Sequence, residues 1–428
     1  MSGIQQMLTG GTYTPAIASY FADVNLSYGW SVATDSANNI YTYGRVSATG
    51  YTSLIKYDKA GTVVWKKICT LGANSANRIT VDSSGNIIIV RSTGTSIAVI
   101  KFDSTGAITW QKSITGFPSG CSGVQASTGA ITTDSSGDIY VCAPVLAACL
   151  QTLAVVKLSS AGAIVFSVSL TNGFRADGPC AILVDSTGKI NIATGNNGYP
   201  VVLQLTSAGA ISWIKRITNT TSINYCTDIV LDSSDNIYAV GAYDDSSAGF
   251  SGSIIVKFNS SGTVQWNRRF TSAASNGMRF NGVGIDSSAN IYCFGNQTTA
   301  YAQYIVKYNS VGTIQWQRSI TSADIRFSTF DGVVSSDGSP VSISRAAVQS
   351  TGTDRQFVAK IPAAGDKTGT YTLSTISYTY AASSGSDQNP TGITYAVGGF
   401  SSSAITLSTS NLFETVSTSA LTTGLTTL

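Results

Sequence analysis

Residues 79–114, ITVDSSGNIIIVRSTGTSIAVIKFDSTGAITWQKSI, contain four short runs of β-branched and aromatic residues. Tight Asp/Ser/Gly turns and looser polar loops separate these runs alternately. Because such runs between such turns are typical of strands, the stretch predicts four antiparallel β-strands. Most of the chain repeats this stretch, so its fold decides the fold of the protein.

The first tight turn of the stretch marks the repeat. It begins with an Asp, which is followed three residues later by Gly or a Gly-like residue and then by an aliphatic residue. The Asp recurs about every 50 residues, a period too long for a solenoid repeat and typical of a four-stranded propeller blade. Its positions are Asp35, Asp82, Asp134, Asp185, Asp232 and Asp286, and Ser335 takes its place in a seventh copy.

A second marker confirms the phase of the repeat. A Lys stands five residues before a Gly, and an aromatic residue follows four residues after that Gly. We expect the aromatic residue to pack between adjacent blades and the Lys stem to cover apolar surface, although a ring of lysines for phosphate or an acidic polymer is the alternative. The Lys positions are Lys56, Lys101, Lys157, Lys257, Lys307 and Lys360, with Gln204 in the fourth copy, and the aromatic positions are Trp65, Trp110, Phe166, Trp213, Trp266 and Trp316.

These markers resemble the SBBP family of β-propeller repeats. The pattern DSSGNIY stands here as DSSDNIY at 232–238, and IVKFNSSGTVQW follows at 255–266. The resemblance covers roughly Trp30 to Tyr380 and implies an all-β, seven-bladed β-propeller of four-stranded antiparallel blades. We therefore expect a propeller at 30–380, an N-terminal docking arm at 1–29 and a Ser/Thr-rich, β-rich C-terminal extension at 381–428. Propellers serve catalysis, binding and scaffolding alike, so the fold does not give the function.

The fourth residue of each first turn must tolerate positive φ. Gly85, Gly137, Gly188 and Gly338 meet this demand directly, and Asn38 and Asp235 meet it at some cost. Ala289 fits poorly, so we expect a strained or altered turn in the sixth copy.

The seventh copy departs from the repeat near its end. After Gly365 comes an insertion, DKTG, and Leu373 replaces the aromatic residue. We expect the fourth strand of this copy at 370–380. In the extension, 393–400 and 404–410 read as a hairpin, and an uncharged β-prone segment of this kind is an aggregation hazard unless something covers it. We expect it to contact other chains.

Composition excludes several classes of function. Only 11% of the residues are charged, the formal charge is +3, and no basic run occurs, so nothing indicates nucleic-acid binding. No apolar stretch is long enough to span a membrane. The seven cysteines lie in different copies without a C-x-x-C, and no His is present to complete a zinc site, so we expect free, mostly buried thiols and no metal or cofactor. These thiols are Cys69, Cys121, Cys142, Cys149, Cys180, Cys226 and Cys293.

Residues for catalysis are scarce. The chain has no His, and its only Glu is Glu414 in the extension. Ser-His-Asp and Cys-His arrangements are therefore excluded, and most glycosidases need a Glu. A polysaccharide depolymerase would have to use aspartates alone, and the candidates are Asp244, Asp245, Asp324 and Asp331. The turn aspartates suggest calcium, but each turn offers one carboxylate where a calcium site needs several, so hairpin caps are the preferred interpretation.

The longer loops gather at one end of the blades. In a four-stranded meander the first and third turns lie at one end, while the second turn and the connection to the next blade lie at the other, which we call the variable face. Its loops are rich in aromatic residues, which favours a surface for a partner or a glycan. Alternatively, the same residues tuck under their loops as small cores. The candidates are Phe117, Tyr243, Phe250, Met278, Arg279, Phe280, Arg326, Phe327 and Phe330.

The N-terminus, MSGIQQML followed by glycines, resembles the N-termini of virion proteins from tailed bacteriophages, particularly tail and fibre components. A short apolar peptide before a flexible Gly-Gly can dock in a groove of another protein, and Ile4, Met7 and Leu8 are the candidate anchors. An arm packed along its own propeller is the alternative.

Taken together, these features predict a non-catalytic structural component of a virion. It would bind other virion proteins through residues 1–12 and 381–428, as a homo-oligomer or part of a larger assembly. A host-glycan-binding module is the second hypothesis, and an aspartate depolymerase is the third.

Overall fold

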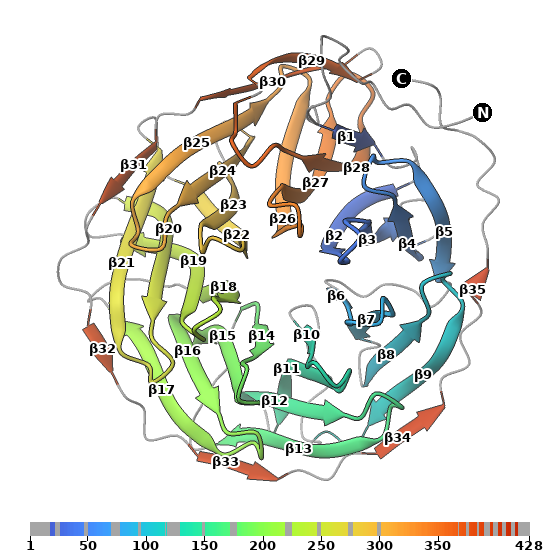
Figure 1. Cartoon of the computed structure of the whole chain (residues 1–428), viewed down its shortest axis with the longest axis vertical. Coiled ribbons are helices and arrows are strands. Elements are labelled where there is room, and N and C mark those ends of the chain that lie inside the picture. The colour runs from blue at the N-terminus through green and yellow to red at the C-terminus, as the bar shows by residue number, and fades with distance from the viewer. Residues whose placement is uncertain are drawn as a thin grey trace. The chain divides into compact units, whose positions relative to one another are not determined.

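A computed structural model shows the architecture of the chain (Figure 1). It describes residues 18–21, 26–46, 50–69, 78–92, 96–115, 117, 129–147, 150–171, 178–218, 225–245, 250–272, 277–297, 301–366, 368–373, 376–382, 385–388, 394–396, 401–404, 408–411 and 416–417. The protein is an all-β, seven-bladed propeller of four-stranded antiparallel blades, as the repeat predicted. In the part of the chain described, no helix has the length and apolarity that a membrane crossing needs.

The chain divides into two compact units, and one of them holds blades 2 to 5. Each of these blades is a meander of four consecutive strands. Blade 2 comprises β6 (Arg78–Val81), β7 (Ile87–Ser92), β8 (Ile97–Phe102) and β9 (Ile108–Thr115); blade 3 comprises β10 (Ala130–Thr133), β11 (Ile139–Ala147), β12 (Leu150–Leu158) and β13 (Ile164–Thr171). Blade 4 comprises β14 (Ala181–Val184), β15 (Ile190–Asn196), β16 (Tyr199–Leu205) and β17 (Ile211–Thr218); blade 5 comprises β18 (Tyr225–Leu231), β19 (Ile237–Asp245), β20 (Phe250–Phe258) and β21 (Val264–Ser272).

The other unit holds blades 1, 6 and 7. Blade 1 comprises β2 (Leu26–Thr34), β3 (Ile40–Val46), β4 (Thr52–Tyr57) and β5 (Val63–Cys69). Blade 6 comprises β22 (Met278–Ile285), β23 (Ile291–Gln297), β24 (Ala302–Tyr308) and β25 (Ile314–Thr321). Blade 7 comprises β26 (Ile325–Val334), β27 (Pro340–Val348) and β28 (Thr353–Lys360), with β1 (Ala18–Phe21) as its fourth strand.

The fourth strand of blade 7 corrects the sequence prediction. We expected it at 370–380, but β1 pairs with β28, with Ala18 opposite Lys360 and Phe21 opposite Phe357. Residues 370–380 instead contribute to β29 (Gly369–Leu373) and β30 (Ile376–Ala382), and β30 pairs with β25 of blade 6. Blade 7 therefore combines β1 with three strands that lie about 300 residues later in the sequence, and residues 18–21 complete its four strands.

The rest of the extension also pairs with the blades of the same chain. β32 (Thr394–Ala396) pairs with β17, β33 (Ser401–Ala404) with β13, and β34 (Ser408–Asn411) with β9. These strands visit blades 4, 3 and 2 in that order, and Figure 1 shows them in red along the fourth strands. β35 (Val416–Ser417) pairs with β5 of blade 1. A further short strand of the extension is β31 (Gly385–Gln388).

The expected hairpin of 393–400 and 404–410 is therefore wrong, because β32 and β34 pair with different blades. A short Ser/Thr hairpin buries little apolar surface, whereas the fourth strand of a blade offers a row of unpaired backbone N–H and C=O groups. The backbone of the described strands β32 to β35 pairs within the chain, and the expected contact of 381–428 with other chains stays a prediction.

The first turns form as their residues dictate. In blade 2, the Asp82 carboxylate accepts hydrogen bonds from the N–H groups of Ser84 (3.0 Å) and Asn86 (2.8 Å), and Gly85 has φ +78°. In blade 6, Ala289 occupies the glycine position with φ +58° and still donates its N–H to the Asp286 carbonyl at 2.9 Å. The turn is thus kept and the alanine is strained, because a Cβ is unfavourable at positive φ.

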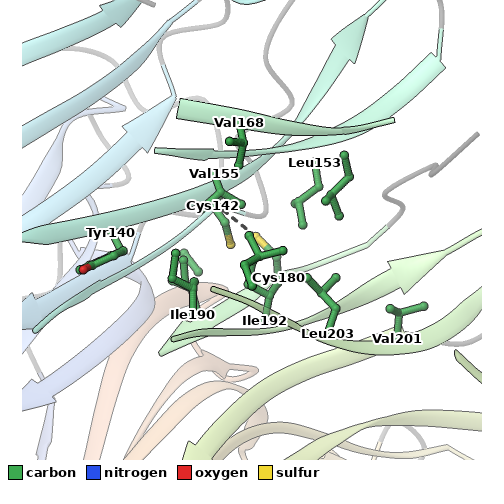
Figure 2. Packing of buried hydrophobic residues seen from close by; sticks show 14 of the residues in the cluster. Tyr140, Cys142, Leu153, Val155, Val168, Cys180, Ile190, Ile192, Val201 and Leu203 are labelled. Carbon is green, nitrogen blue, oxygen red and sulfur yellow. Dashed lines mark hydrogen bonds between the residues drawn. The ribbon is translucent and has the colours of Figure 1, made fainter. Parts of the chain in front are cut away.

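Apolar residues from facing sheets form the core. Between blades 3 and 4, Leu153 and Val155 of β12 pack with Ile192 of β15, as Figure 2 shows. The Cys180 thiol donates a hydrogen bond to the Cys142 carbonyl at 3.4 Å in the same cluster. The five cysteines within the described residues are free and buried, which confirms the expectation for them, while Cys121 and Cys149 lie outside those residues.

The repeated aromatic residue joins one blade to the next, as predicted. The Trp110 Nε1 of blade 2 donates to the Ser160 carbonyl in the last turn of blade 3 at 3.1 Å. The ring of Trp213 lies against Gly262 in the last turn of blade 5, where an added Cβ would be 2.7 Å from a ring carbon. The glycine therefore serves two purposes, since it allows the left-handed turn and gives room for the indole.

Replacing Gly262 by Ala tests this contact, and Gly85→Ala is a matched control. Both glycines have φ +78°, but a Cβ at Gly85 would meet nothing within 4 Å. We expect Gly85→Ala to lower the free energy of unfolding by about 1 kcal/mol through backbone strain alone. Gly262→Ala should lose about 1–3 kcal/mol more because the indole must move. Urea unfolding measures both, and equal losses would contradict the packing role.

Candidate functional site

The turn aspartates form hydrogen bonds and ion pairs within their own blades. The Asp286 carboxylate accepts hydrogen bonds from the side chains of Asn290 (2.8 Å) and Tyr292 (3.1 Å) and lies 3.7 Å from the Lys307 ammonium. Burial alone would raise the pKa of Asp286, but these hydrogen bonds hold that pKa below its ordinary value. The carboxylate is thus ionised and fully engaged by its own blade.

The repeated lysines belong to the same arrangement. The Lys307 ammonium also lies 4.8 Å from the centre of the Tyr292 ring and donates to the Ala363 carbonyl of blade 7 at 3.4 Å. Lys307 is thus paired with a carboxylate and a ring of its own blade, which confirms the structural role for this lysine and disfavours a ring of free cations for an acidic polymer. The equivalent ion pairs are Lys101 with Asp82, Lys157 with Asp134 and Asp138, and Lys257 with Asp232.

In blades 4 and 7, different residues replace members of the Asp–Lys pair at the first turn. In blade 4, the Gln204 amide donates to the Asn191 side chain (3.0 Å) and to the Ser260 carbonyl of blade 5 (3.3 Å), so a neutral amide replaces the lysine. In blade 7, Ser335 stands at the Asp position, and Asp337 two residues later supplies the carboxylate, 2.7 Å from the Lys360 ammonium.

The turn aspartates of the described residues do not gather into a calcium site. Within these ranges no group of three or more His, Cys, Asp or Glu side chains is placed to hold a metal. Each turn carboxylate accepts hydrogen bonds from its own turn instead, as Asp232 does from Ser234 N (2.9 Å) and Asn236 N (3.0 Å). The cap interpretation therefore describes these residues.

The aspartates considered for catalysis are also engaged where the structure describes them. Asp331 is buried and accepts hydrogen bonds from the Ser31 hydroxyl (2.7 Å) and the Val32 N–H (3.2 Å), which links blade 7 to blade 1. Asp324 accepts the Ser350 N–H at 2.7 Å. Seven residues along a strand separate the two, about 20 Å, which exceeds the spacing of a glycosidase carboxylate pair. The side chains of Asp244 and Asp245 lie outside the described residues.

Three of the predicted partner-binding residues lie in the core. Met278, Phe280 and Phe327 are fully buried, and the Phe327 ring packs 5.0 Å from that of Phe357. Strands β22 and β26 start earlier than the sequence suggested, so these residues alternate into the sheet interface rather than standing in a loop. The prediction for them is corrected, because a buried side chain offers no surface to a partner.

The remaining partner-binding candidates differ in their exposure. Phe117 is half-buried and packs, like Trp110, against the core cluster that contains Ile114, and Arg279 and Phe330 are half-buried. Arg326 is exposed. The side chains of Tyr243 and Phe250 and the whole of Ile4, Met7 and Leu8 lie outside the described residues. The partner-binding role stays a prediction for all of these.

The structure brings Arg326 and Phe330 together with residues that the sequence did not single out. The Arg326 guanidinium lies 4.4 Å from the centre of the Tyr301 ring, and that of Arg345 lies 4.9 Å from the centre of the Tyr28 ring. The rings of Tyr28 and Phe330 meet edge to face at 6.4 Å. We call these five residues, Tyr28, Tyr301, Arg326, Phe330 and Arg345, the arginine–aromatic surface.

Strand pairing places the two arginines near each other in blade 7. Arg326 pairs with Ala347 and Ser328 with Arg345, so the two arginines are diagonal neighbours on one side of the sheet. Arg326 is the second residue of β26, Arg345 lies near the end of β27, and Tyr301 lies in the second turn of blade 6. All belong to the variable face. The only sequence signal for Tyr301 is that a tyrosine stands in a second turn. Its partner, Arg326, belongs to the next blade, so the sequence does not show the contact.

The Asp337–Lys360 pair gives a test of pH dependence. Burial alone would raise the pKa of Asp337, but hydrogen bonds from Lys360 and Ser335 lower that pKa to about 2. A depressed carboxyl pKa stabilises the fold above the unfolded value, about 3.9, and this stabilisation is lost as the pH falls toward 2.

We expect Asp337→Asn to lower the free energy of unfolding by about 1 kcal/mol at pH 7, after solvent screening, and to change it little at pH 2. Urea unfolding across this pH range measures the effect, and a double-mutant cycle with Lys360→Met isolates the pair. A loss independent of pH would contradict the assignment.

Comparisons with known proteins give only distant structural neighbours. No protein-family model matches the chain, and no curated protein matches it. Among solved structures, a protein of unknown function from Bacteroides caccae is 13% identical, with TM-score 0.38 over 59% of this chain and 93% of that one. XC5397 from Xanthomonas campestris, described as a gluconolactonase, is 10% identical, with TM-score 0.41 over 81% and 90%. The polysaccharide lyase Uly1 is 9% identical, with TM-score 0.49 over 81% and 99%. All three TM-scores are below 0.5, so these similarities carry no argument about the function of this chain.

Proposed function

We propose that the protein is a non-catalytic interaction platform that serves as a structural component of a tailed-phage virion, in the tail or a tail fibre. The arginine–aromatic surface is the observation that carries the platform role. Arg326 is exposed and Tyr301 is 40% exposed. Tyrosine, arginine and phenylalanine are the residue types that protein interfaces favour.

The geometry of this surface suits recognition. The two arginines lie over tyrosine rings, and Arg345 also pairs with Asp354 at 2.8 Å, so their side chains are held before a partner arrives. A pre-ordered arginine loses less conformational entropy when it binds. The carboxylates of the described residues support the same proposal, because those named above serve turns and blade contacts rather than a catalytic pair.

The virion assignment rests on the N-terminal resemblance, with residues 1–12 as the attachment segment. Since β32 to β35 of the extension pair with their own chain, attachment falls to these first residues and to the arginine–aromatic surface. The SBBP resemblance and a homo-oligomeric state are further parts of the proposal.

Deleting residues 1–12 tests the attachment role. We expect a folded propeller, because β1 begins only at Ala18 and keeps its pairing with β28. Particles assembled with this variant should lack the protein, as measured by immunoblotting of purified particles. Normal incorporation would refute the docking role, and unchanged circular dichroism of the isolated variant is the control for folding.

Binding of a host glycan is the second hypothesis, and the arginine–aromatic surface provides its test. Arg326→Ala and Tyr301→Ala should each weaken binding by about tenfold or more if a glycan stacks there, since a lost contact of about 1.4 kcal/mol has that effect. Val311→Ala is the matched control, because Val311 is 64% exposed in the last turn of blade 6, away from the variable face. A glycan array compares the three variants, and retained binding in all of them would exclude this surface.

An aspartate depolymerase is the third hypothesis and has the weakest support. Asp331 holds blade 7 to blade 1, so its replacement would disturb the fold together with any cleavage. Asp244→Asn is the informative variant for polysaccharide cleavage.

A further inference from the structure

Gln356 carries a buried amide at the seam between blades 7 and 1. It belongs to β28, it is fully buried, and among the described residues neither its Oε1 nor its Nε2 has a hydrogen-bond partner. The side chain packs over blade 1, where a Cβ added at Gly29 would be 2.8 Å from the Gln356 Cγ and one added at Gly44 would be 2.9 Å from its Oε1. Because a buried polar group without a partner is costly, this amide indicates a bound molecule.

The seam between blades 6 and 7 shows how the same position is satisfied elsewhere in the chain. Gln303 occupies in blade 6 the position of Gln356, four residues before the repeated lysine. The Gln303 Nε2 donates to the Ser342 hydroxyl, and the Ser344 hydroxyl donates to the Gln303 Oε1 at 3.3 Å. An amide at this position is therefore held there by hydroxyl groups of the next blade.

Two glycines stand in blade 1 where blade 7 has hydroxyl residues. In blade 7, Thr329 pairs with Ser344, and the equivalent pair in blade 1 is Gly29 with Gly44. The close approach of the backbone requires the glycine at 44, because an added Cβ would be 2.1 Å from the Tyr28 carbonyl oxygen. Blade 1 thus has no counterpart of the Ser344 hydroxyl to offer the amide.

Ser53 adds a second buried group and leaves room beside it. It pairs with Gly44, so both lie on the side of blade 1 that faces Gln356. Its hydroxyl has no hydrogen-bond partner among the residues that the structure describes. The equivalent residue of blade 7 is Phe357, which pairs with Ser344 and places a phenyl ring in its seam. A serine in place of that ring leaves space in the seam of blades 7 and 1.

We propose that this seam holds ordered water, bound by the Gln356 amide and the Ser53 hydroxyl. The amide oxygen needs a hydrogen-bond donor and the amide N–H groups need an acceptor, and a water molecule is both. A buried water typically makes about three hydrogen bonds to groups of this kind. A metal cation does not fit, because the Nε2 hydrogens would repel it.

The site adjoins the arginine–aromatic surface. Tyr28 precedes Gly29 in the sequence, and Arg345 pairs with Gln356. Water at this site takes the place of the direct hydrogen bonds that join the amide of blade 6 to blade 7. It therefore supports the strands that carry Tyr28 and Arg345, whichever partner that surface binds.

A crystal structure of the full chain, at a resolution that shows ordered water, tests the proposal directly. We expect electron density for water within about 3 Å of the Gln356 amide. Two results would overturn the proposal. One is a seam without water, and the other is an amide that donates directly to the Tyr28 carbonyl.

Gln356→Met, with Gln303→Met as the matched control, gives a second test in solution. Methionine keeps the length of the side chain and removes both polar atoms. If water satisfies Gln356, each variant loses hydrogen bonds of ordinary strength, and each should raise the unfolding equilibrium constant about tenfold in urea unfolding. An unchanged or lowered constant for Gln356→Met, beside a raised one for Gln303→Met, would show that the Gln356 amide has no partner to lose and would contradict the proposal.

Discussion

The contact of an aromatic ring with a glycine turn is the constraint on which the rest of the propeller depends. A single four-stranded blade cannot bury both of its faces, so it is stable only against neighbours. The ring on the fourth strand reaches over the last turn of the next blade, where Trp316 donates to the Ala363 carbonyl at 3.2 Å and lies against Gly365. The contact fixes the distance between adjacent sheets, and the apolar side chains between those sheets then pack at one spacing.

This construction uses the repeated lysines and the turn aspartates. The lysine on the third strand, the aspartate of the first turn and the tyrosine of the second strand form one cluster, and it recurs with small changes from blade to blade. An ionised carboxylate that accepts several hydrogen bonds is stable inside such a cluster and is a poor acid or base for a substrate.

The strands of the extension pair with the outer edges of the blades. A fourth strand with an unpaired edge invites another chain to add to it, and short strands from the extension cover such edges in blades 1 to 6. Strand ends and second turns of the variable face can change without disturbing the sheets. Arg326 and Tyr301 occupy such positions, and their partners come from different elements.

The sequence alone determined the number of blades, the phase of the repeat and the left-handed turns, because each depends on residues a few positions apart. Asp82 with Gly85, and Lys307 with Trp316, are local patterns whose geometry follows from the strand and turn they occupy. The strain at Ala289 was predictable for the same reason. Only the tertiary structure decided that residues 18–21 complete blade 7 and that β32 and β34 join separate blades. It also decided that Phe280 and Phe327 are buried and that the Arg345 guanidinium lies over the Tyr28 ring. These outcomes depend on which unpaired strand edge or apolar surface lies nearby in space, and a short Ser/Thr strand or a single Phe has the same sequence character whichever partner it finds.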